Sequence, residues 1–291
     1  MDHPCPAPVG ADRRGSVFAR LWGGYRRTLF QVASRSRCLS SGWWWVVTAT
    51  WIGSVPFLVS YGLELSRQGP VSIPNPEGLA GHQLLSGIAL SVLCLGCALD
   101  DAWVKGLAAI MLAFAAHALV VITLSHYRPA QSAAVLPGGT EYWHKQIRWI
   151  ETGRDEEYDW RHWVPAHGTL LAGTTVYSFS SLGALTFSLG FYQVDLMNYY
   201  NARLIDRSVR RGQAAFTAWH IWSLLRGIGY LFLTFEVLSL ALQVQLGMRI
   251  SSWRTRGLRW SLGLSFLLAD GVVKWFLLEA VRLQLFQNLS G

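Results

Sequence analysis

Four ionisable residues inside long apolar segments are the first candidates for chemistry: Arg226, Glu236, Asp270 and Lys274. The first two lie in the apolar stretch 219–246 and the last two in 258–278. A charge at the centre of a membrane helix costs about 2.5–3.5 kcal/mol on insertion scales, so it usually has a partner or a function. Asp270 and Lys274 share one helix face and could pair, whereas Arg226 and Glu236 need partners elsewhere, for which 258–278 is the candidate. These residues indicate either an ion or substrate path or a structural ion-pair network.

His117 is the one histidine placed well inside an apolar stretch, 103–124. A haem held by two histidines needs a second ligand at matching depth on a facing helix. His82 is the only suitable second histidine, but it begins an apolar stretch and should lie nearer the membrane surface. His117 is therefore a candidate ligand for a haem or pigment, and a buried, hydrogen-bonded histidine is the alternative that we favour.

Two short motifs combine a carboxylate and a histidine at a spacing of three, Glu141-x-x-His144 and Asp159-x-x-His162. On a helix this spacing lets both side chains bind one metal ion, and two such motifs occur in di-iron helix bundles. Those sites also need carboxylates from further helices, and both motifs fall in one polar segment. Glu141, His144, Asp159 and His162 are candidate metal ligands, with a chance spacing as the preferred interpretation.

Other reactive residues do not assemble into a catalytic motif. Cys94-x-x-Cys97 has a redox spacing, but it lies within an apolar stretch and the polar loops offer no shuttle cysteines. Ser180 and Ser181 lack the flanking glycines and the base of a serine nucleophile. The sequence therefore favours a protein without a catalytic site of its own.

The composition is typical of a membrane protein, with 291 residues, 14% charged residues and a mean hydropathy of +0.27. The net charge of +8 comes with no recognisable nucleic-acid-binding motif, so we exclude nucleic acid as a partner. Arginines that flank membrane helices and meet anionic lipid account for the positive charge. We predict an all-α, polytopic membrane helix bundle.

The hydrophobic pattern predicts about six transmembrane helices after an N-terminal arm, 1–42. Within the arm, 16–32 has the periodicity of an amphipathic helix that lies on the membrane or packs on the protein. The transmembrane domain, 43–291, would have spans at 43–65, 82–99, 103–124, 168–194, 219–246 and 258–278. The six spans behind a surface helix resemble the membrane domains of some export permeases, without a shared motif.

The span 168–194 is uncharged but rich in serine, threonine and glycine, which favours close helix packing over a polar conduit. The preceding polar segment, 125–167, contains four tryptophans and should lie against the membrane surface: Trp143, Trp149, Trp160 and Trp163. The following segment, 195–218, is expected to be an aqueous helix. Its arginines and those of the arm predict a cytoplasmic location for both.

With the arm inside, 125–167 would be an outer loop. Four arginines near 247–257 would then also face outward, against the rule, unless the fifth span is re-entrant. No cleavage site follows the first span, which indicates a retained anchor, and we predict a bacterial plasma membrane.

The predicted function is a non-catalytic integral subunit of a larger membrane complex, permease-like or a scaffold. Its partners would be the lipid bilayer and other membrane-protein subunits. Two alternatives are open: an ion- or solute-coupled transporter or channel that uses the four intramembrane charges, and a redox subunit associated with a haem, pigment or quinone. The cofactor, the substrate and the oligomeric state are not determined by the sequence.

Overall fold

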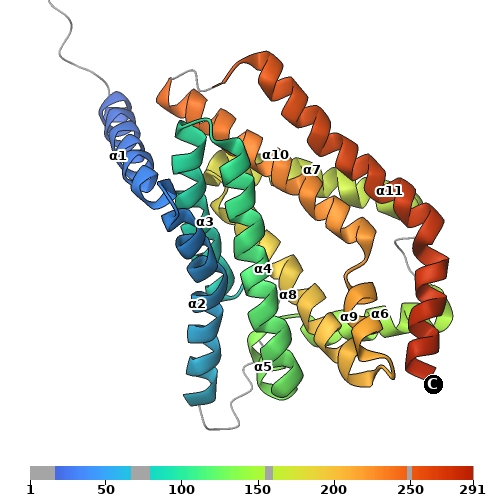
Figure 1. The fold of residues 1–291 in the computed structure, drawn as a ribbon. Coiled ribbons are helices and arrows are strands. Elements are labelled where there is room, and N and C mark those ends of the chain that lie inside the picture. The colour runs from blue at the N-terminus through green and yellow to red at the C-terminus, as the bar shows by residue number, and fades with distance from the viewer. Residues whose placement is uncertain (1–16, 67–78, 155–159, 248–250, 291) are drawn as a thin grey trace, which may run out of the picture.

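The computed structural model describes residues 17–66, 79–154, 160–247 and 251–290, and every regular element in them is a helix (Figure 1). The helices are α1 Val17–Ser40, α2 Trp44–Ser66, α3 Gly81–Leu99, α4 Trp103–Tyr127, α5 Pro129–Val135, α6 Gly139–Thr152, α7 Trp160–Ser181, α8 Ala184–Arg207, α9 Arg211–Ala218, α10 Ile221–Leu246 and α11 Trp253–Ser290. The predicted all-α membrane helix bundle is confirmed.

Five segments are long and apolar enough to cross a membrane: α2, α3, α4, the segment 211–246 that contains α9 and α10, and α11. Their outer faces expose large apolar side chains, among them Trp51, Leu119 and Trp275. Such faces are stable against lipid, because hydrocarbon does not penalise an apolar surface. The length and apolar composition of these helices indicate an integral membrane protein. The structure has five candidate spans, where about six were expected.

The difference lies in 168–194, which is a helical hairpin rather than one span. The backbone turns at Leu182 and Gly183, whose φ angles are +52° and +86°, and α7 and α8 lie on either side of the turn. Ser91, halfway along α3, donates a hydrogen bond to the carbonyl oxygen of Leu182. The turn therefore lies at mid-depth in the bundle, and α8 leads from it back to α6, where Arg207 lies against Trp143.

The hydroxyl groups of this stretch join the two arms of the hairpin. Ser178 Oγ donates to Thr186 Oγ1 at 2.9 Å, and Thr186 Oγ1 donates to the carbonyl oxygen of Thr174 at 3.3 Å. These contacts match the helix-packing role that the small and hydroxylated residues suggested.

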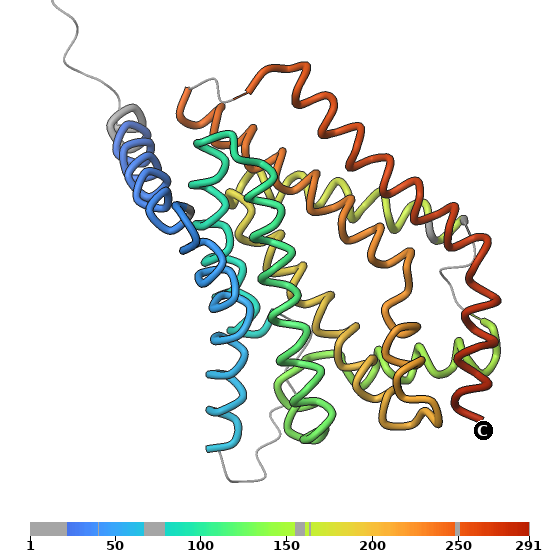
Figure 2. Tube along the Cα trace, in the orientation of Figure 1, coloured from blue at the N-terminus to red at the C-terminus, as the bar shows by residue number. Residues whose placement is uncertain are grey.

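The hairpin changes which segments share an end of the bundle. We call the end that carries α1 the α1 end and the opposite one, where α5, α6 and α9 lie, the α6 end (Figure 2). At the α6 end the Arg207 guanidinium lies 5.1 Å from the ring centroid of Trp143, and the Val209 amide donates to the carbonyl oxygen of Asn288. The polar segments before and after the hairpin thus share one end, where opposite sides were expected.

Two other expectations concern segments that could lie on the membrane surface, the amphipathic helix α1 and the tryptophans of α6. α1 lies on α3, where Ser36 approaches Gly96 so closely that a Cβ there would be 2.8 Å from the Ser36 backbone. Within the predicted helix, Leu29 is buried and Tyr25 donates to Gln245 of α10, so one face packs on the protein, and a membrane contact of its exposed face stays a prediction. Trp143 and Trp149 of α6 are buried in the core against α8 and α11 rather than at the membrane surface. The side chains of Trp160 and Trp163 lie outside the described residues.

Buried apolar residues form two core clusters. One lies toward the α1 end and includes Leu90, Phe191 and Phe235, and the other lies toward the α6 end and includes Phe57, Trp143 and Tyr200. Where the clusters meet, α2, α3, α4 and α8 enclose a group of buried polar side chains.

Candidate metal site

His82, His117 and Asp195 meet at the junction of the two core clusters, each from a different helix. His117 Nε2 lies 2.6 Å from Asp195 Oδ1, and His82 Nε2 lies 3.0 Å from Asp195 Oδ2. The three ligand-type atoms lie within 4.8 Å of one another. All three side chains are at most 1% exposed, so the cluster is shielded from solvent.

Glycines bring the helices close enough to form this cluster. A Cβ at Gly53 of α2 would lie 2.0 Å from the carbonyl oxygen of Ala113 on α4. A Cβ at Gly87 of α3 would lie 2.6 Å from the backbone nitrogen of Ser188 on α8. Real Cβ atoms cannot approach this closely, so α2–α4 and α3–α8 pack backbone to backbone only because glycine is present.

Gln83, which follows His82 on α3, hydrogen-bonds to the Asp195 carboxylate. Its Nε2 donates to Asp195 Oδ2 at 2.7 Å, while its Oε1 accepts from the backbone amide of Ala80 at 2.7 Å. The second bond fixes which end of the amide faces the carboxylate. Asp195 Oδ2 therefore has two partners, Gln83 and His82, and Oδ1 has His117.

The contact between His117 and Asp195 requires an additional proton or a metal ion. His117 Nδ1 lies 2.8 Å from the Gly53 carbonyl oxygen, which only accepts, so Nδ1 carries hydrogen. His117 Nε2 then faces Asp195 Oδ1, and a neutral imidazole beside an ionised carboxylate would place two acceptors in contact. An additional proton or a metal ion between them removes the conflict.

Aromatic rings enclose the two imidazoles. Phe57 makes edge contacts with His82 and His117, with centroid distances of 5.1 and 5.6 Å, and Phe191 contacts His117 at 4.9 Å. Both Nε2 atoms, which would have to ligate a haem iron, are instead in contact with the carboxylate of Asp195. The haem-ligand hypothesis for His117 is therefore not supported by its surroundings.

Toward the α6 end, the buried surface below the cluster is polar. Asn198 lies one turn beyond Asp195 on α8, and Tyr61 and Ser125 lie two turns beyond Gly53 and His117 on their helices. The amide of Asn198 and the hydroxyls of Tyr61 and Ser125 are buried without a hydrogen-bond partner among the described residues. Buried polar groups of this kind are commonly satisfied by internal water.

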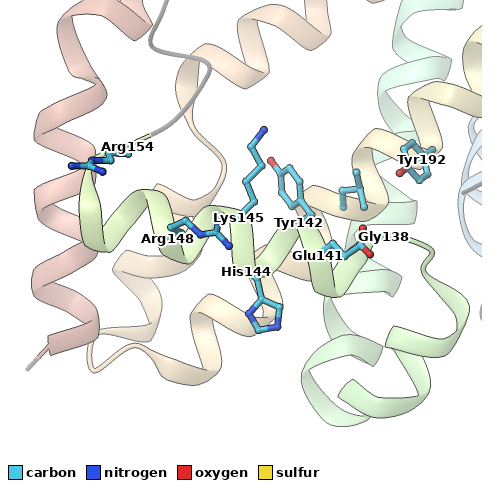
Figure 3. A pocket seen from close by; sticks show the side chains of 9 residues that line it. Gly138, Glu141, Tyr142, His144, Lys145, Arg148, Arg154 and Tyr192 are labelled. Atoms are coloured by element: carbon cyan, nitrogen blue, oxygen red, sulfur yellow. The ribbon is translucent and has the colours of Figure 1, made fainter.

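The other proposed metal ligands do not come together in the described part of the chain. Glu141 and His144 lie on α6, where they line a surface pocket with cationic residues (Figure 3). His162 is exposed on α7, and Asp159 lies outside the described residues. The carboxylate–histidine spacing therefore did not locate the cluster, and Cys94 and Cys97 are buried elsewhere in the core.

Three of the four intramembrane charges form ion pairs between α10 and α11: Arg226, Asp270 and Glu236. Arg226 Nε lies 2.8 Å from Asp270 Oδ2, and Glu236 Oε1 lies 2.9 Å from Arg259 Nη1, so both expected partners are on α11. Arg259 also binds Asp101 of the α3–α4 turn at 3.0 Å. Lys274 is buried one turn from Asp270. The charges thus join helices at the α1 end and along the α10–α11 contact.

Sequence reasoning found both histidines but missed Asp195 and Gln83. His82 was expected nearer the surface than His117; the structure corrects this, because α4 continues beyond the level at which α3 begins. Asp195 was assigned to an aqueous helix, since it starts a polar segment after an uncharged stretch. The hairpin turn at Leu182–Gly183 instead carries it into the interior. Its only sequence signal was its position directly after the apolar run.

Comparison of the chain with protein-family models, curated proteins and solved structures found no match. The cluster itself is therefore the basis for a functional conclusion.

Proposed function

We propose that this integral membrane protein binds a divalent transition-metal ion through His82, His117 and Asp195. Two imidazoles and one carboxylate form a donor set that suits zinc, iron and related ions. The observation that carries the proposal is the approach of three ligand atoms from three helices to within 4.8 Å. A metal ion would also replace the proton that the His117–Asp195 contact otherwise needs.

The surroundings of the cluster favour a structural role for the ion. The three side chains are almost fully buried, and apolar rings cover both imidazoles, which leaves a substrate no direct approach. A bound ion would join α3, α4 and α8 and stabilise the folded state, which alone holds the ligands together.

We further propose that the metal-stabilised bundle serves as a non-catalytic subunit of a membrane complex, as a scaffold or permease-like component. The exposed apolar faces of the candidate spans could contact partner helices as well as lipid. Purification in mild detergent tests this role: reproducible, stoichiometric co-purification of another membrane protein is expected, and a monomer without partners would contradict it.

The metal site is tested by loading the detergent-purified protein with Zn²⁺ or Co²⁺ and measuring bound metal by mass spectrometry. We expect about one ion per chain, absorption bands for Co²⁺ that report histidine ligation, and loss of both in His117→Gln and Asp195→Asn. His144→Gln and His162→Gln, which remove exposed histidines, serve as matched controls and should bind normally.

Chelation of the unmodified protein provides a measurement that does not depend on whether the variants fold. Removal of the ion should lower the unfolding temperature, and adding it back should restore it. Binding below about a tenth of an ion per chain under saturating metal, or equal loss of metal in the matched controls, would contradict the site.

A transporter is the second candidate, because four charged side chains lie within α10 and α11. If Asp270 lies on an ion path, Asp270→Asn should abolish proton or cation flux in proteoliposomes while the protein stays folded. If its ion pair with Arg226 is structural, the same substitution should lower the unfolding temperature instead. Unchanged flux would remove the transport proposal.

A further inference from the structure

A pocket of about 610 Å³ lies at the α6 end, between α6 and α8. Its walls include Tyr142, Lys145 and Arg148 of α6, Arg154 just after that helix, and Tyr192 of α8. Figure 3 shows Lys145 and Tyr142 projecting to the same side of α6, with Tyr192 across from them on α8. None of these residues belongs to the metal site.

The pocket is cationic, and its charges are not used within the described protein. Lys145, Arg148 and Arg154 line it, against the single carboxylate of Glu141. The three cationic side chains make no hydrogen bond or ion pair with another described residue. The Tyr192 hydroxyl is similarly without a hydrogen-bond partner in the described part of the chain and faces Gly138 at the pocket wall.

The buried face of α6 fixes the orientation of the helix and therefore of its cationic face. Trp143, Trp149 and Ile150 are buried against the rest of the bundle, so the helix presents its charged side outward. α6 crosses the end of the bundle shortly after the candidate span α4 ends at Tyr127 (Figure 1). A helix at this level lies where a bilayer has its phosphate groups.

We propose that this pocket binds the phosphate group of an anionic phospholipid headgroup. Lys145 and Arg148, which lie three residues apart on α6, supply positive charge, and Arg148 can donate paired hydrogen bonds to phosphate oxygens. Arg154 and Tyr192 lie at opposite ends of the pocket and add charge and a hydrogen-bond donor farther from that phosphate. A lipid seated there would contact both α6 and α8, and would hold the end of the bundle at the membrane boundary.

The experiment measures lipid binding to the detergent-purified full chain by native mass spectrometry, with phosphatidylglycerol and phosphatidylcholine of identical acyl chains. The test variant combines Lys145→Gln, Arg148→Gln and Arg154→Gln. Its matched control removes three exposed cations outside the pocket, by Arg210→Gln, Arg211→Gln and Arg254→Gln. Arg148→Lys separates the requirement for charge from that for the guanidinium group.

We expect the unmodified protein to prefer phosphatidylglycerol, and the pocket variant to bind it roughly tenfold or more weakly, with little change in the control. Inorganic phosphate and glycerol 3-phosphate, added as competitors, distinguish the sources of phosphate. No displacement supports a lipid, whereas displacement and direct binding of the competitor support the phosphate site with a soluble ligand. Equal affinity for both lipids, or an equal loss in the two triple variants, would overturn the proposal.

Discussion

At the scale of single residues, the chemistry of the protein centres on Asp195. One carboxylate accepts a hydrogen bond from Gln83 and contacts both His82 and His117. Because the Gly53 carbonyl already fixes hydrogen on His117 Nδ1, the remaining contact needs an additional proton or a metal ion between the two acceptor atoms. The same hydrogen bonds also orient the ligands for a metal ion, as hydrogen bonds to metal-binding residues generally do.

Gln83→Ala tests the support that this residue gives to the site. The change leaves the Ala80 amide and one side of the Asp195 carboxylate without their partner, which should cost about 1–3 kcal/mol of stability. Metal affinity should fall by about 10–100-fold, as expected when a residue that positions a ligand is removed. Thermal unfolding and metal titration are the measurements. Gln287→Ala, on an exposed part of α11, is the control; equal effects of the two changes would contradict this role.

At the scale of the elements, the site depends on how closely the helices approach. α2 lies against α4 at Gly53, and α3 lies against α8 at Gly87, in both cases with no room for a side chain. Charged contacts join other elements: Arg259 of α11 binds both Glu236 of α10 and Asp101 in the α3–α4 turn. The bundle thus combines glycine contacts near the site with ion pairs toward the α1 end.

Gly53→Ala should separate α2 from α4. The new Cβ would lie 2.0 Å from the Ala113 carbonyl oxygen, and overpacking of this kind costs about 1–3 kcal/mol. The bond from His117 to Gly53 should weaken, so metal binding should fall together with the unfolding temperature. Gly62→Ala is the matched control on the same helix, because its Cβ meets open space. It should be neutral or stabilising by up to about 1 kcal/mol, and a Gly53→Ala protein as stable as the control would show that the contact is not tight.

Glu236→Gln should destabilise the contact between α10 and α11. Glu236 is 1% exposed, and its removal leaves the buried guanidinium groups of Arg256 and Arg259 without this carboxylate. Breaking a buried ion pair from one side costs about 3–5 kcal/mol. In Glu279→Gln, the lost ion pair with Arg282 involves a carboxylate that is 59% exposed, so the change should be small. Thermal unfolding in detergent compares the two variants, and similar unfolding temperatures would argue against a structural role for the Glu236 network.

At the scale of the whole molecule, the α7–α8 hairpin sets the topology. If the five candidate spans cross the membrane, α6 and the end of α8 lie on the same side of it, because Arg207 lies against Trp143. The segment between α10 and α11 then shares the side of α1, where Tyr25 donates to Gln245. The arginines near 247–257 would then lie on the same side as the N-terminal arm. The arginines near 203–211 would lie on the side opposite to the arm. The cytoplasmic location of the N-terminus therefore stays a prediction.

Single cysteines can test this arrangement in a chain whose four native cysteines are replaced. Thr140→Cys and Val209→Cys should react with a membrane-impermeant maleimide from the same side of sealed vesicles. Ser41→Cys and Ser252→Cys should react from the other side, and all four positions are exposed. Permeabilised vesicles, in which every position should react, are the control. Labelling of positions 140 and 209 from opposite sides would restore the continuous span 168–194.

The sequence by itself predicted that this protein lies in a lipid bilayer, and it predicted most of the helices. Apolar segments without charge must satisfy their peptide groups internally when they lie in lipid, so their helical structure follows from local composition. The same reasoning identified His117 and His82 as the pair to consider, and α11 as the partner for Arg226 and Glu236.

The tertiary structure alone decided where the chain turns within the bundle and what meets at the site. Leu182 and Gly183 look like part of one continuous uncharged span, and only packing against Ser91 of α3 and Leu238 of α10 makes the turn there evident. His82 and Asp195 are 113 residues apart in the sequence. Their contact depends on glycines at which two helix backbones approach closely, and the sequence around each glycine does not indicate which helix packs there. Local periodicity determines a helix, but the depth at which a side chain lies depends on which helices surround it.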